Sequence, residues 1–95
     1  MIRLNSDNLP TLSHGDVELL KALLKDLDEM NAKAPEYGFY IAYIDDESDD
    51  YYGCYRLKCD KLGESESFGV EMTIHELDSA MCVVSEMIDM IFGGE

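Results

Sequence analysis

Two helix-start patterns, one near each end of the chain, constrain this sequence more than any other feature. Ser13 and Asp16 have the spacing of a capping box, and Thr73 and Glu76 repeat it. In such a box each side chain bonds the backbone N–H of the other residue, which satisfies donors that a helix start would otherwise leave unpaired. The sequence therefore predicts two helices with residues 34–72 between them.

Each start pattern is followed by apolar residues at helical spacing. The first stripe consists of Leu20, Leu23, Leu24, Leu27 and Met30. The second consists of Leu77, Met81, Val84, Ile88 and Ile91, widened by Ala80, Val83 and Met87. The first helix is expected to end near Lys33, because Pro35 disfavours helical geometry in the residue before it. Gly93 and Gly94 are expected to stop the second helix. Both stripes are expected to pack into the core.

The region between the helices is typical of strands. Residues 37–44 are rich in aromatic and β-branched side chains, residues 51–59 alternate, and residues 67–72 alternate again. The run DDESDD at 45–50 falls between the first two strands and is predicted to be a hairpin loop. The strand register stays open, since a slip of one residue exchanges the faces. The first twelve residues are expected to be an extended lead-in.

The order helix, three strands, helix predicts an α+β fold, with both amphipathic helices packed on an antiparallel sheet. Residues 1–95 are expected to form a single acidic domain. Cys54, Cys59 and Cys82 lack CxxC spacing, and no signal peptide is apparent, which favours free thiols in the cytoplasm. No apolar run approaches the roughly 18 residues that a membrane span needs.

The charge of the chain narrows the classes of partner. It has 21 acidic and 7 basic residues, for a net charge of −14, and residues 36–95 hold 15 of the acids but only 3 of the bases. Direct nucleic-acid binding and attraction to an anionic membrane both need Lys and Arg, so neither is expected. A basic protein partner is favoured. Acidity that serves only solubility remains the alternative.

Metal and catalytic chemistry have little support in the sequence. Counted from Asp45, the calcium-loop pattern requires Gly at position six and Glu at position twelve, but Asp50 and Arg56 stand there. Zinc would need four ligands gathered from scattered Cys and His residues. No nucleophile elbow, glycine-rich phosphate loop or HExxH motif occurs. We expect no metal, no cofactor and no catalytic residue, and hence no enzyme activity.

The size of the chain, its acidic run with flanking tyrosines and its order of elements together resemble small phage-encoded inhibitors that imitate DNA, of the anti-CRISPR and anti-restriction type. The resemblance implies that carboxylates occupy the basic groove of a CRISPR–Cas or other defence nuclease and exclude nucleic acid. The residues expected to do so are Asp45, Asp46, Glu47, Asp49 and Asp50, with Tyr52 as an aromatic contact and with Glu64, Glu66 and Glu71 in support.

Two other functions remain open at this stage. An immunity protein or antitoxin that covers a basic toxin would use the same surface on another target. A structural module would instead use its helices for self-association, for example as a homodimer, and its charge would serve solubility.

Overall fold

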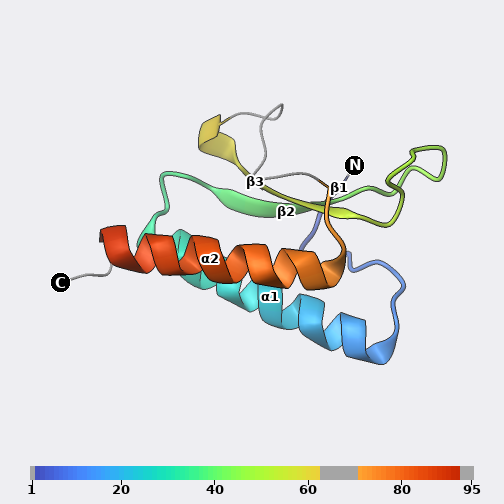
Figure 1. Cartoon of the computed structure of the whole chain (residues 1–95), viewed down its shortest axis with the longest axis horizontal. Coiled ribbons are helices and arrows are strands. Elements are labelled where there is room, and N and C mark those ends of the chain that lie inside the picture. Colours follow the sequence, from blue (N-terminus) through green and yellow to red (C-terminus); the bar gives the residue numbers. More distant parts are fainter. Residues whose placement is uncertain (1, 63–70, 93–95) are drawn as a thin grey trace.

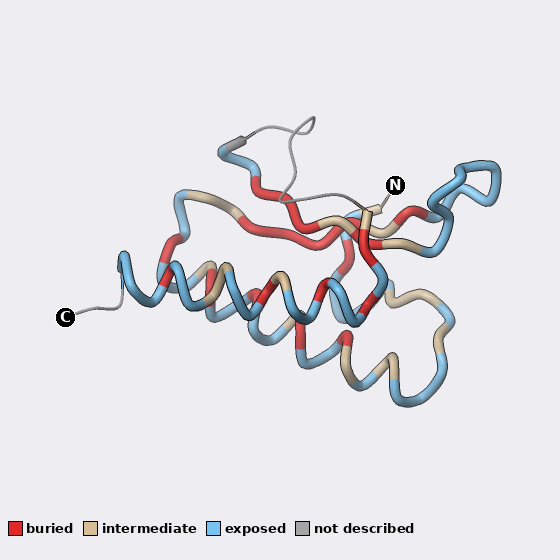
Figure 2. The backbone as a smooth tube through the Cα atoms, viewed as in Figure 1, coloured by how far each residue is buried: buried red, intermediate tan, exposed pale blue. Residues whose placement is uncertain are grey.

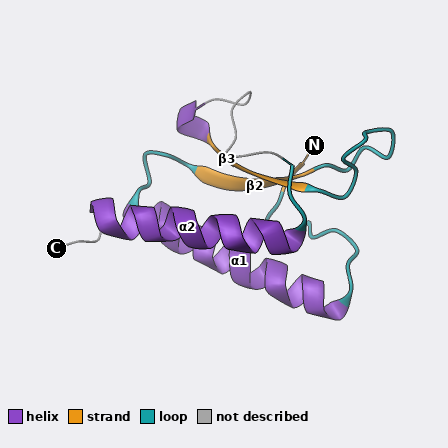
Figure 3. Ribbon diagram, viewed as in Figure 1, coloured by secondary structure: helices purple, strands orange, loops and turns teal. Residues whose placement is uncertain are grey.

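A computed structural model of the chain describes residues 2–62 and 71–92. Two helices lie side by side against one face of a three-stranded antiparallel sheet (Figure 1). In chain order the elements are β1 (Ile2–Arg3), α1 (His14–Lys33), β2 (Phe39–Tyr43), β3 (Tyr55–Cys59), the 3-10 helix η1 (Asp60–Leu62) and α2 (Ile74–Phe92). The predicted α+β fold is confirmed, as is the antiparallel sheet with both helices on it (Figure 3).

Both helices begin where the capping boxes predict. The Ser13 hydroxyl accepts a hydrogen bond from the Asp16 N–H at 3.3 Å. At the second start the bonding is reciprocal, because the Thr73 hydroxyl accepts from the Glu76 N–H at 3.2 Å while the Thr73 N–H donates to the Glu76 carboxylate at 2.9 Å. Each cap satisfies backbone donors that have no partner within the helix.

The hairpin register, which the sequence leaves open, is set by the pairing of β2 with β3. Tyr43 lies opposite Tyr55, and the Ile44 N–H donates to the Cys54 carbonyl oxygen at 3.0 Å. The backbone pairing therefore continues beyond the two strands and leaves residues 45–52 as the loop. The predicted second strand at 51–59 is shorter in the structure, since its first residues belong to this loop.

The first strand of the sheet comes from the N-terminal lead-in. β1 pairs antiparallel with β2, with Arg3 opposite Ala42, so a segment expected to be only extended gains a partner. Most of the strand predicted at 67–72 lies outside the described residues. Its last residue, Met72, forms an isolated antiparallel bridge with Tyr55.

The core lies between the sheet and the two helices (Figure 2). Its largest fully buried side chains are Leu20, Leu23, Met30, Ile41, Leu57, Cys59, Leu77 and Met81. On the opposite face of the sheet, Tyr40, Ala42 and Lys58 are also buried. The guanidinium of Arg3 lies over the Tyr40 ring at 3.7 Å from its centroid and bonds Asp60 at 2.8 Å, which ties β1 to this face.

The second half of α2 departs from the prediction. Val83, Met87 and Ile91 are expected to be buried, but their exposed fractions are 58, 54 and 69%. A helix of 19 residues is about 28 Å long, whereas a five-residue strand spans about 17 Å. The end of α2 consequently extends beyond β2 (Figure 1). The apolar arc of α2 is wider than the surface available to cover it.

Candidate functional site

The acidic loop, defined here as residues 45–52, extends from one end of the sheet (Figure 1). It joins β2 to β3 and contains five of the eight carboxylates of the predicted site together with two tyrosines. Every residue in it is exposed (Figure 2). The hairpin thus brings the densest group of acids in the chain to a projecting tip, as the sequence predicts for its position.

Two of the acids shape the loop that carries them. The Asp46 carboxylate accepts hydrogen bonds from the Ser48 N–H at 3.0 Å and from the Ser48 hydroxyl at 2.7 Å. The Asp49 carboxylate accepts from the Tyr51 N–H at 2.8 Å. Side chains of Asp commonly stabilise turns in this way. The bonds from Ser48 hold the pKa of Asp46 below its ordinary value, so this group stays ionised at physiological pH.

Two further carboxylates of the loop have no base beside them among the described residues. Glu47 and Asp50 are exposed and have no hydrogen bond or ion pair with any residue that the structure describes. The ion pairs within residues 2–62 and 71–92 lie elsewhere: Arg3–Asp60, Lys21–Glu18, Lys33–Asp89 and Arg56–Glu71. Glu47 and Asp50 therefore present their negative charge directly to solvent.

Both tyrosines of the loop are half exposed. The exposed fractions are 52% for Tyr51 and 50% for Tyr52. Only Tyr52 is predicted as an aromatic contact, yet the two tyrosines are equally exposed and adjacent in the chain. An aromatic ring with a polar end provides a large, rigid contact area beside the carboxylates. Tyr51 is therefore added to the candidate surface.

The supporting acids of the predicted site are not part of the described loop surface. Glu64 and Glu66 lie outside the described residues. Glu71 is described, and its carboxylate accepts a hydrogen bond from the guanidinium of Arg56. Its side chain is only 15% exposed. The charge of Glu71 is thus already balanced, and the candidate surface rests on the acidic loop.

No protein-family model, curated protein or solved structure matches this chain. Its function is therefore inferred from the charge, exposure and shape of its surfaces. Of the residues described, no three His, Cys, Asp or Glu side chains come together as metal ligands. None of the described helices has the length and apolar character to cross a membrane.

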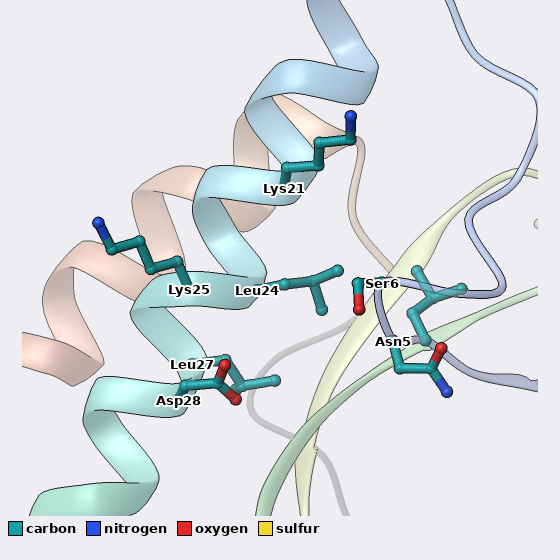
Figure 4. A pocket seen from close by; sticks show the side chains of 8 residues that line it. Asn5, Ser6, Lys21, Leu24, Lys25, Leu27 and Asp28 are labelled. Carbon is teal, nitrogen blue, oxygen red and sulfur yellow. The ribbon is translucent and has the colours of Figure 1, made fainter.

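A pocket of about 290 Å³ lies between α1 and the segment that follows β1 (Figure 4). Leu4, Leu24 and Leu27 supply apolar walls, and Asn5 and Ser6 lie across from the helix. The amino groups of its two lysines, at positions 21 and 25, extend in different directions and away from Asn5 and Ser6. Since ligand sites have polar groups that converge on one point, this pocket is a poor candidate.

A second hollow, of about 190 Å³, runs beside the last turns of α2 and is almost entirely apolar. The residues that line it are Tyr37, Phe39, Val84, Met87, Ile88, Ile91 and Phe92. This surface is not predicted from the sequence, because every apolar residue of α2 at helical spacing is expected to be in the core. The sequence does contain a sign of this exposed surface, because Val83 and Met87 make the apolar arc of α2 wider than the regular stripe alone.

Proposed function

We propose that this protein is a non-enzymatic inhibitor that binds the basic nucleic-acid-binding surface of a CRISPR–Cas effector or another defence nuclease. The acidic loop would occupy that surface and keep DNA or RNA out. One observation carries the proposal: five exposed carboxylates and two half-exposed tyrosines share a projecting hairpin tip, and no ion pair within the described residues neutralises Asp46, Glu47, Asp49 or Asp50. The three free cysteines suit action in the cytoplasm.

The physics of nucleic-acid binding supports this use of the loop. A DNA strand presents about one phosphate every 3.4 Å, and DNA-binding proteins contact these phosphates with Lys and Arg side chains. A run of carboxylates offers the same sign of charge to the same groove. Long-range attraction between opposite charges raises the association rate and weakens as salt screens it. Tyr51 and Tyr52 would supply contact area that does not depend on charge.

The loop carboxylates are tested by neutralising them without altering their shape. The loop variant carries Asp45→Asn, Asp46→Asn, Glu47→Gln, Asp49→Asn and Asp50→Asn. A matched control neutralises five exposed carboxylates of α1 and the segment after it: Glu18→Gln, Asp26→Asn, Asp28→Asn, Glu29→Gln and Glu36→Gln. Both variants change the net charge by the same amount, so a difference between them reports the position of the charge.

Tagged wild-type protein, the loop variant and the control variant are each used to capture proteins from a host lysate at low salt. Mass spectrometry then identifies what is retained. The proposal expects wild type and control to retain a nuclease or Cas subunit that the loop variant loses, and expects wild type to displace labelled DNA from that subunit. Capture of a basic toxin would show an immunity protein instead. Equal capture by all three would show that the loop is not the binding surface.

A further inference from the structure

The second half of α2 exposes several large apolar side chains. This α2 apolar face consists of Val83, Met87, Met90, Ile91 and Phe92. Met90 and Ile91 are 81 and 69% exposed, which is unusual for side chains of this size. Large exposed apolar patches on a folded chain commonly mark surfaces that bind another protein.

The α2 apolar face borders a groove whose lining residues pack against one another. Phe92 contacts the Tyr37 ring edge to face, with centroids 6.0 Å apart, and Tyr37 stacks on Phe39 at 5.6 Å. Ile88 lies on the buried side of the groove and is 5% exposed. These contacts connect the end of α2 to the start of β2, so the groove is formed by packed elements rather than by a single helix.

The charge of α2 decides what kind of partner fits. Its ionised side chains are Glu76, Asp78, Glu86 and Asp89, and it contains no Lys or Arg. Lys33 of α1 is the base beside it, and that amino group already bonds Asp89. Paired helices lie 8–10 Å apart, which is within about one Debye length at physiological salt. A second copy would therefore place two acidic helices against each other in a protein of net charge −14.

We propose that the α2 apolar face binds an amphipathic helix of a different protein, with large apolar side chains on one face and Lys or Arg along the flanks. Apolar anchors of such a helix would enter the groove, which is a common mode of peptide recognition. Its basic flanks would be attracted by Glu86, an exposed carboxylate that has no ion pair with any described residue. The proposal does not rest on the function proposed for the acidic loop, because the two surfaces lie toward opposite ends of a molecule 45 Å long (Figure 1).

The probe is a fluorescent peptide of about 15 residues, long enough to form a helix when bound. It carries Leu and Phe on one helical face and Lys and Arg on both flanks. A scrambled peptide of identical composition controls for attraction between opposite charges alone. The double variant Met87→Gln, Ile91→Gln removes apolar anchors from the groove. The variant Tyr51→Ser, Tyr52→Ser removes two exposed aromatic side chains outside the groove and serves as its control.

Fluorescence anisotropy measures the dissociation constants, and circular dichroism verifies that each variant unfolds at the wild-type temperature. We expect the variant Met87→Gln, Ile91→Gln to bind the peptide at least about tenfold more weakly than wild type. The variant Tyr51→Ser, Tyr52→Ser should bind it as wild type does. Equal binding of the scrambled peptide would overturn the proposal. So would sedimentation equilibrium showing a wild-type dimer that the groove variant converts to a monomer, because a second copy would then occupy the face.

Discussion

The guanidinium of Arg56 donates a hydrogen bond to the carboxylate of Glu71 on the face of the sheet opposite the helices. The two side chains are 29 and 15% exposed, so the pair is partly shielded from water. The bond joins β3 to the segment that leads into α2, at a point next to the bridge between Tyr55 and Met72. It gives Glu71 a structural role and separates it from the acidic loop.

Breaking this pair is expected to cost stability because the remaining partner keeps its charge without compensation. Arg56→Ala should lower the free energy of unfolding by about 2 kcal/mol, and Glu71→Gln by about 1 kcal/mol. Urea denaturation measures both values. The double variant should lose less than the sum of the two, since residues in contact are coupled. Strict additivity would show that the pair contributes no interaction of its own.

Tyr55 is expected to tolerate loss of its hydroxyl group. Its side chain is 2% exposed, and the oxygen has no hydrogen-bond partner among the described residues. A buried polar group without a partner costs free energy that its removal recovers. Tyr55→Phe should therefore raise the free energy of unfolding by about 1 kcal/mol. Tyr51→Phe, at an exposed position, should leave it unchanged, and a loss of stability in Tyr55→Phe would reveal a bond that the fold needs.

The same burial predicts sensitivity to alkali. Desolvation raises the pKa of Tyr55 from 10.0 to about 12, with a smaller contribution from the neighbouring Tyr43. In the unfolded chain the phenol loses its proton near pH 10, whereas in the folded chain it stays neutral until about pH 12. The difference in pKa leaves the free energy of unfolding unchanged below pH 10 and lowers it progressively as the pH rises from 10 towards 12.

Thermal unfolding followed from pH 9 to pH 12 tests this prediction. The wild-type midpoint should fall across the interval, and Tyr55→Phe should show a shallower fall because it lacks the titrating group. Burial also raises the pKa of Tyr43, so a smaller dependence should persist in the variant. Identical pH profiles for the two proteins would show that Tyr55 does not contribute.

Ser48 is expected to control the ionisation of one loop acid. Its N–H and hydroxyl both donate to Asp46 and lower the pKa of that carboxyl. Ser48→Ala removes the hydroxyl bond, so the pKa of Asp46 should rise towards its ordinary value. NMR titration of the Asp46 carboxyl carbon in wild type and variant measures the change. An unchanged pKa would mean that the bond from the Ser48 N–H alone lowers the pKa of Asp46.

Local features of the fold could be predicted because they depend on residues close together in the chain. The capping boxes at Ser13 and Thr73 involve partners three positions away, and the alternation in β3 follows from strand geometry alone. The position of the acidic loop follows in the same way from the strands on either side of it. Its exposure agrees with the prediction, since burying so many carboxylates in a core would cost too much free energy.

The remaining features depended on contacts between distant parts of the chain. The partner of the lead-in strand, the pairing of Glu71 with Arg56, and the exposure of Met87 and Ile91 are all of this kind. By itself the sequence determined where the helices begin, which residues of β3 share a face and where negative charge gathers, whereas the pairing of β2 with β3 decided which of those faces meets the core. Only the tertiary structure decided which half of the wide apolar arc of α2 is covered, because α1 and the sheet are too narrow and too short to cover it all.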